Sequence, residues 1–481
     1  MITSVLKLPR QPWVTTLLLA LFCLAAAVVL GRMAADPSKL RLLVAGSMIM
    51  VLFAFSQRKP TVVIYLLLMY LPFLGFIRRL LIPVAGWNSM DPFVVVGPFM
   101  ILVLVSKWVF DTYKNKLPIE YDTRLFQLVR WMLLVDLLQV FNPMQGSLFT
   151  GFAGVMFYIV PVCYMILGRQ YMDEKKLKFI AASVYAVGLI SAVYGYKQFF
   201  LGYSDFEDMW IDLSGYTALK VYSVFRPISF FTSASEYAHY LGIASIIGWV
   251  YFLRSKSKSG KLLSLLGLAL LLSAMFIESA RGIIVTSAAA MMAIALMNVR
   301  KASQKLLVGL MAVVVTAGLG VGMTKLNMEN DLIYHSVIGL TDPFGEEATT
   351  VGHLVMMVEG FAKGIANPLG HGLGSTTIAA GKFNSMTVSS EVDLSNKFLA
   401  TGVVGGVLYT IIMIKTLTLA FRESHRSSLH LMILGVLIAE GGQWLNGGHY
   451  STAGLIWLMI GYIDREKGKS SANRVDRPDA E

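Results

Sequence analysis

Charged residues and cysteines are scarce in this chain. Only 15% of its 481 residues are charged, whereas 56% are hydrophobic. A soluble globule carries more charge than this, so that class of protein is excluded. The two cysteines, Cys23 and Cys163, both lie in apolar runs, where packing roles are expected rather than a disulfide or a metal pair.

Motifs for nucleotide, metal or hydrolase chemistry are also missing. The glycine run at 367–375 follows no predicted strand and has no P-loop lysine, which excludes a dinucleotide or P-loop site. His335, His353 and His371 are too widely spaced for the close His-x-x-x-His pair typical of zinc sites. No nucleophile elbow and no Ser/His/Asp set is recognisable. We therefore expect neither a cofactor nor a metal.

Apolar runs fill most of the chain, and a helix needs about 17–25 such residues to cross a bilayer. The predicted fold class is all-α, a polytopic transmembrane bundle of about 12–14 spans in one domain (1–465), followed by a disordered basic tail at 466–481. The first span lacks an Ala-x-Ala-like cleavage site and is expected to remain as an anchor. The predicted spans lie near 13–31, 40–56, 61–77, 92–110, 123–140, 151–168, 177–199, 229–253, 262–278, 281–298, 306–324, 396–420, 429–447 and 450–463.

Basic residues gather in alternate connectors. A cytoplasmic N-terminus puts all of these clusters in the cytoplasm, as the positive-inside rule requires. Both termini are then cytoplasmic, and a bacterial inner membrane is the expected location. The net charge of +12 follows from this topology, and no clustered basic face indicates a nucleic-acid partner. The clusters lie at 58–59, 107–124, 175–178, 254–258, 300–301 and 422–426.

The long connector at 325–397 is predicted to lie outside. It holds three of the seven histidines and eight carboxylates, and long connectors are usually functional or disordered. Thr349 or Thr350 is expected to cap a helix that runs to about Ala366, where Asn367-Pro368 ends it. We expect this helix to roof a cavity. Its apolar stripe consists of Leu354, Met357, Val358, Phe361 and Ile365, opposite the pair Glu359 and Lys363.

Two arginines lie at the outer ends of predicted spans. Arg281 falls in a connector of almost no length, and Arg226 precedes another span on the same side. Their planar guanidinium groups fit the oxygens of a diphosphate. Alternatively, Arg281 pairs with Glu278 and Arg226 with Glu236, and composition favours neither interpretation.

Other charges in or near spans are interpreted as structural. Arg130 and Asp136 share one predicted span and form a candidate ion pair, unless Arg130 extends to the inner interface. Arg78-Arg79 begin a segment with Pro83, Gly86 and Trp87 that is typical of an interfacial or re-entrant element.

Four segments occur in a recognisable order. They are Arg226 with Ser229-Phe-Phe-Thr-Ser-Ala-Ser-Glu-Tyr-Ala-His-Tyr-Leu241, Ser279-Ala-Arg281-Gly282, His353 to Asn367-Pro-Leu-Gly-His-Gly-Leu-Gly374, and Asn396-Lys-Phe-Leu-Ala-Thr-Gly-Val-Val-Gly405. Together they resemble the O-antigen ligase and Wzy-type polysaccharide polymerase superfamily of membrane glycosyltransferases. The resemblance covers about residues 220–410, and the first two hundred residues add only hydropathy.

The resemblance implies a transfer reaction at the outer membrane face. A glycan on undecaprenyl diphosphate would pass to a hydroxyl of an acceptor sugar by a single displacement with inversion, without metal or nucleotide. Arg226 and Arg281 would hold the diphosphate and stabilise the leaving charge. His371, Asn396 and Glu236 are the further substrate-binding candidates.

The base in this reaction is less directly implied. The family's ligases typically have a histidine before the asparagine of the last segment, and here that position is Ser395. The role would shift to Asp393 or Glu391. His353 stands where many members have an arginine, and it would contact phosphate or donate a proton.

The missing histidine favours a polymerase of lipid-linked repeat units for an exopolysaccharide, capsule or O-antigen. Its partners would be the lipid-linked donor, the acceptor glycan and the bilayer, with a chain-length regulator and other assembly proteins as further candidates.

The nearest alternative is a ligase that moves a finished glycan to a lipid or protein. A transporter or flippase of lipid-linked sugars is the rival of another class, although the sequence has no visible internal repeat. A scaffold protein would not need the two arginines.

Overall fold

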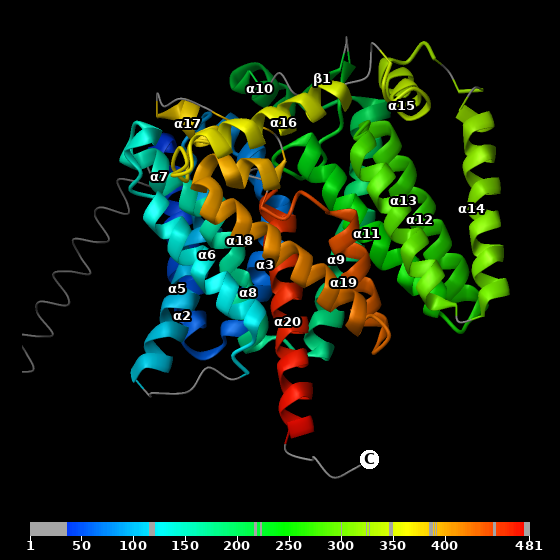
Figure 1. Ribbon diagram of the computed structural model, residues 1–481. Helices are drawn as coiled ribbons and strands as arrows, with labels where there is room; N and C mark the ends of the chain where they lie inside the picture. The colour runs from blue at the N-terminus through cyan, green and yellow to red at the C-terminus, as the bar shows by residue number, and fades with distance from the viewer. Residues whose placement is uncertain are drawn as a thin grey trace, which may run out of the picture.

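The computed structural model describes residues 36–475 apart from short internal gaps. The predicted first span and the candidate base Glu391 lie outside the described residues. The part described is a helical bundle with one two-stranded hairpin (Figure 1), which confirms the all-α prediction for that part. The gaps are 115–120, 216–218, 222–223, 300, 324, 327, 346–349, 384–387, 389, 391 and 446–448.

The elements up to the hairpin are η1 (Pro37–Lys39), α2 (Leu40–Arg58), α3 (Pro60–Leu80), α4 (Ile82–Ala85), α5 (Phe93–Lys114), α6 (Arg124–Gln139), η2 (Pro143–Gln145), α7 (Leu148–Gly154), the π-helix η3 (Val155–Ile159), α8 (Val160–Tyr171), α9 (Glu174–Leu201) and α10 (Asp205–Ser214). The strands β1 (Lys220–Val221) and β2 (Val224–Phe225) pair antiparallel. The elements after them are α11 (Ala234–Arg254), α12 (Lys258–Glu278), α13 (Arg281–Asn298), α14 (Ala302–Met323), α15 (Asp331–Thr341), α16 (Thr350–Ala366), α17 (Ile378–Lys382), α18 (Asp393–Glu423), α19 (Ser428–Ala439) and α20 (Tyr450–Val475).

Nine helices of the described chain are long and apolar enough to cross a membrane, as expected for a multi-pass membrane protein. They are α2 with η1, α3, α5, α7 to α8 as one unit, α9, α12, α13, α14 and α18. Two predicted spans are shorter in the structure. The 123–140 segment forms the 16-residue α6, and the 429–447 segment forms the 12-residue α19, which stops before Glu440-Gly441-Gly442. Gly442 has a φ of +87°, which lies outside the range of a regular helix.

The two ends of the bundle differ (Figure 1). The helices α10, α15, α16 and α17 and the hairpin gather at one end, which we call the loop end; α20 runs to the opposite, tail end. The 325–397 connector and the segment that leads into α11 therefore share an end, as the sequence predicts. At the tail end, α20 is helical to Val475, so residues 466–475 of the predicted disordered tail are helical.

Close backbone contacts hold the centre of the bundle together. Helix α11 packs against α9, α12, α13 and α19, and α8 packs along α20. A Cβ added at Gly168 would lie 2.2 Å from the carbonyl oxygen of Leu458, and one at Gly461 would lie 2.1 Å from that of Met165. Small residues permit such contacts, which drive helix association in lipid. By contrast, α14 contacts mainly α13 and has no buried residue.

The glycine run after α16 is part of the bundle. Helix α18 is interrupted at Gly402, whose φ is +67°, and the run docks into this break. The carbonyl oxygens of Leu399 and Ala400 accept hydrogen bonds from the backbone N–H groups of His371 (2.8 Å) and Gly372 (3.0 Å). In return, Val403 N–H donates to the carbonyl of Pro368 (3.2 Å).

Candidate functional site

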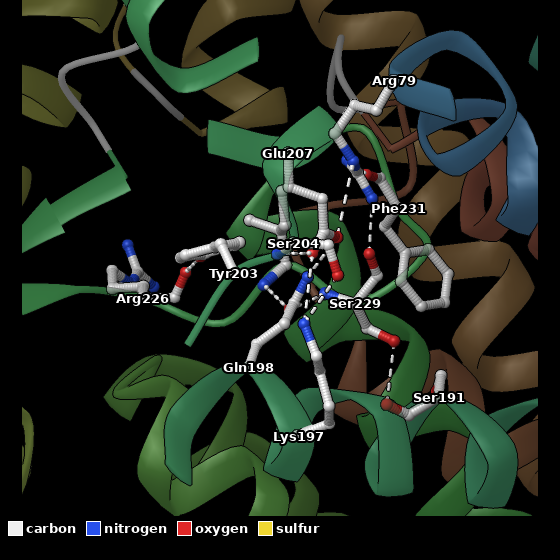
Figure 2. Close-up of polar contacts among 11 residues, drawn as sticks. Arg79, Ser191, Lys197, Gln198, Tyr203, Ser204, Glu207, Arg226, Ser229 and Phe231 are labelled. Atoms are coloured by element: carbon white, nitrogen blue, oxygen red, sulfur yellow. Dashed lines mark hydrogen bonds and ion pairs between the residues drawn. The ribbon is translucent and has the colours of Figure 1, made fainter. Parts of the chain in front are cut away.

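The segment 226–233, which leads into α11, is held by side chains from two other helices (Figure 2). Gln198 of α9 accepts a hydrogen bond from the backbone N–H of Ser229 (2.7 Å). Arg79 of α3 donates to the carbonyl oxygens of Phe231 (2.7 Å) and Ser229 (2.5 Å). Because Ser229 has a φ of +48°, an unfavourable conformation for a serine, these bonds stabilise a strained turn.

Glu207 of α10 joins the two supporting side chains. It accepts a hydrogen bond from Gln198 (2.7 Å) and lies 4.0 Å from Arg79 Nε and 3.9 Å from Lys197 Nζ. Arg79 is buried, with 1% of its surface exposed. It therefore has the structural role that the sequence favours, as the support of the segment that carries Arg226.

Arg226 forms an ion pair with Glu278, the last residue of α12. The distance from its Nη2 to Glu278 Oε1 is 2.5 Å, and Nε donates to the Glu278 carbonyl at 3.0 Å. The pairing of Arg226 with Glu236 that the sequence offered is wrong. The end of α12 lies beside the Arg226 segment, whereas Glu236 is bonded to α20. Arg226 keeps 19% of its side chain exposed at the loop end.

The connector between α12 and α13 is covered by α15. Its turn residue Ser279 has a φ of +72°, and its Oγ lies 2.6 Å from Nδ1 of His335. The guanidinium group of Arg281 packs on the backbone of Gly339, because a Cβ added there would lie 1.9 Å from Nη1. The sequence predicted neither contact of α15.

Both arginines affect the pKa of His335. Burial, followed by the positive charges of Arg281 and Arg226, lowers its pKa to about 4. The imidazole is therefore neutral near pH 7. We call Arg226, Glu278, Ser279, Arg281 and His335 the arginine cluster; it contains two guanidinium groups and one carboxylate.

Glu236, a predicted substrate-binding residue, connects two helices. Its Oε1 accepts hydrogen bonds from the backbone N–H (2.8 Å) and hydroxyl (2.7 Å) of Ser451 in α20, and its Oε2 accepts one from the hydroxyl of Thr232 (2.5 Å). The side chain is fully buried. In this structure Oε1 holds α11 against α20, and Oε2 holds the segment that leads into α11.

The candidate base Asp393 and the candidate ligand Asn396 are also buried. Asp393 accepts hydrogen bonds from the backbone N–H of Leu445 (2.6 Å) and the hydroxyl of Tyr409 (3.3 Å). Asn396 accepts one from the backbone N–H of Ser390 (2.8 Å). Both residues thus fasten neighbouring connectors to the start of α18.

The two remaining histidine candidates lie in different surroundings. His353 is exposed in the first turn of α16, whose bounds match the predicted helix. By helical periodicity it shares a face with Gly360 and Gly364, which pack on α18. The Nδ1–H of His371 donates to the carbonyl of Leu399 (3.1 Å), so His371 belongs to the docked glycine run and not to the arginine cluster.

A second charged group lies inside the bundle and was not predicted from the sequence. His239 of α11 lies with its Nδ1 2.7 Å from Oε2 of Glu440, and its ring centroid is 4.4 Å from that of His449. His449 in turn makes a 2.9 Å hydrogen bond with Ser235. The signal was available, because His239 and Glu440 are ionisable residues within predicted spans, where a functional role is the default hypothesis.

A buried ion pair joins α6 to α18. Lys397 Nζ lies 2.6 Å from Asp136 Oδ1, and neither side chain is exposed. The predicted pairing of Asp136 with Arg130 is wrong, since Arg130 instead binds Asp122 at 2.8 Å. The two residues point to different sides of α6.

Among the residues that the structure describes, no three His, Cys, Asp or Glu side chains are grouped so that they could hold a metal ion. Comparison with protein-family models and with curated protein sequences finds no match for this chain. Sequence and structure together define a multi-pass helical membrane protein whose candidate functional groups are the arginine cluster and the His239–Glu440 pair.

Proposed function

We propose that the protein is a polymerase that transfers glycan repeat units from undecaprenyl diphosphate to a hydroxyl of an acceptor sugar. The observation that carries this proposal is the arginine cluster. Arg226, which pairs with Glu278, and Arg281 place two guanidinium groups close to His335, which is neutral near pH 7. Guanidinium groups form bidentate hydrogen bonds with phosphate oxygens. The cluster therefore suits a diphosphate.

The positive charge of the arginine cluster indicates how the reaction would proceed. The C1–O bond to phosphate breaks as the acceptor oxygen attacks, and negative charge develops on the departing lipid diphosphate. Positive groups fixed in advance stabilise such charge more than flexible ones do. Arg226 is fixed by Glu278, and Arg281 is fixed by its packing on Gly339.

The proposed orientation has the loop end outside and both termini in the cytoplasm of a bacterial cell. The connectors at 254–258 and 422–426 and the end of α20 are basic and lie away from the loop end, which supports this orientation. The lipid-linked donor would then reach the arginine cluster from the outer leaflet.

A polymerase is favoured over a His-dependent ligase because a serine, Ser395, stands where the ligases have a histidine. Its hydroxyl is buried and lies 2.6 Å from that of Ser390. A serine in this position has no basic nitrogen, so the ligase-like proton transfer has no counterpart at that residue.

One observation favours a transporter as the second candidate. Helix α19 has 12 residues, about 18 Å of helix, whereas the bilayer core is about 30 Å thick. Helix α19 is therefore too short to cross the bilayer core alone, and the non-helical residues 440–445 that follow it would lie at membrane depth, where such backbone lines a cavity or is buried in protein. Interrupted helices with ionisable groups are common in transporters.

A reconstitution experiment separates these functions. The full-length protein is placed in liposomes with an undecaprenyl-diphosphate-linked repeat unit and no nucleotide. Longer glycans and free lipid diphosphate are the expected products. Intact donor that moves to the other leaflet without elongation would establish a transporter. Donor that is neither elongated nor moved would overturn the proposal.

A further inference from the structure

A histidine and a carboxylate from different helices meet inside the bundle. His239 lies in the second turn of α11, and Glu440 directly follows α19. Nδ1 and Oε2 are 2.7 Å apart. Glu440 has no exposed side-chain surface, whereas 13% of the His239 side chain is exposed.

Burial of this pair opposes folding. An ionisable group at membrane depth is expensive, and a buried ion pair often stabilises less than apolar residues of the same size would. Glu440 also has an oxygen, Oε1, without a hydrogen-bond partner in the described part of the chain. A pair that serves packing alone would not need these groups.

The geometry fixes the tautomer of His239. An ionised carboxylate only accepts hydrogen bonds, so in the neutral imidazole of His239 the proton lies on Nδ1 and the lone pair on Nε2. None of the described residues bonds to Nε2. A carboxylate that orients an imidazole in this way, and stabilises the imidazolium that forms, is the arrangement of a general base.

Neighbouring groups are less suited to this role. His449 stacks beside His239, but its Nε2 already bonds to Ser235. Asp393 accepts two hydrogen bonds, from Leu445 and Tyr409. Both Asp393 of α18 and Glu278 of α12 interact electrostatically with His239. Glu278, the partner of Arg226, is thus within electrostatic range of His239.

We infer that His239 is the general base of the transfer reaction and that Glu440 is its positioning residue. This inference rests on the function proposed above. The acceptor hydroxyl gives its proton to Nε2, and its oxygen forms the new bond to the anomeric carbon. The C1–O bond to phosphate breaks, and its electron pair leaves with the lipid diphosphate. Nε2 then releases the proton to water, which restores the neutral imidazole.

The test uses full-length variants in the elongation assay. His239→Ala is expected to lower kcat about 10²- to 10⁴-fold while the KM for the donor stays within about twofold, because the arginine cluster is intact. Added imidazole should restore part of this activity. Glu440→Gln keeps an acceptor for Nδ1–H but removes the charge, so a smaller loss in kcat is expected.

The matched control is His430→Gln. His430 is also a buried histidine of the α19 region, but it bonds to Ser427 near the tail end. Its replacement should leave kcat unchanged. Without elongation by the wild-type protein, the proposed function itself fails. With an active wild type, near-normal kcat in His239→Ala, or a loss that imidazole does not relieve, would overturn the assignment of the base.

Discussion

Lys397 and Asp136 form an ion pair of 2.6 Å although 261 residues separate them and neither side chain is exposed. The pair fastens the start of α18 to α6 below the docked glycine run. Lys397 Nζ also lies 4.8 Å from the ring centroid of Tyr158 in η3. Three helical segments therefore meet at one ammonium group.

Removal of one partner of this pair should destabilise the protein strongly. In Lys397→Met the Asp136 carboxylate remains buried without its cation, and we expect a loss of about 3–5 kcal/mol. The double variant Asp136→Leu/Lys397→Met should recover most of that loss. Unfolding in mixed micelles measures both, and a double variant as unstable as the single one would contradict the explanation.

Arg281→Ala should abolish elongation while the protein remains folded in the membrane. Loss of one preorganised positive group typically lowers kcat about 10²- to 10³-fold. Arg130→Ala is the matched control, because Arg130 pairs with Asp122 and is partly exposed. Product length on gels reports the result. Normal chain length in Arg281→Ala would remove Arg281 from the diphosphate site.

The stability of the protein should depend on His335 at acidic pH. Its pKa is about 4 in the folded protein, against 6.5 as the ordinary value, so the folded state binds the proton more weakly. The stability present above pH 6.5 is therefore lost as the pH falls from 6.5 towards 4. The apparent Tm of His335→Gln should fall less over this window than that of the wild type. His425→Gln, at an exposed position in the connector between α18 and α19 at the tail end, should behave like the wild type.

The break in α18 should require a glycine. Gly402 has a φ of +67°, and an added Cβ would lie 2.0 Å from the carbonyl oxygen of Pro368. Gly402→Ala thus combines backbone strain with a clash, and we expect it to cost about 3 kcal/mol or more. Gly381→Ala in α17, where a Cβ would meet no atom within 4 Å, should be neutral. Equal Tm values for the two variants would contradict this account.

Local pattern predicted much of the fold. Apolar length marked most of the helices, and the helix predicted to run to about Ala366 matches the bounds of α16. Where the backbone leaves the helical conformation inside an apolar run, the hydropathy pattern did not predict the end of the helix. The predicted span at 429–447 ends at Ala439, because Gly442 adopts a positive φ that hydropathy does not register.

The sequence predicted the two arginines of the candidate site but not the residues around them. Arg226 and Arg281 stood out because charge at the end of an apolar run is unusual. Their surroundings did not, since Glu278 and His335 become neighbours only when α12 and α15 pack at the loop end. The same holds for His239, whose partner is 201 residues away.

The sequence by itself determined that the chain crosses the membrane repeatedly and where its charges lie along it, because helix formation in lipid depends on local apolar length. The tertiary structure alone decided which charges meet. Arg226 takes Glu278 and Asp136 takes Lys397, since ion pairs follow from the packing of distant helices, which no local period encodes.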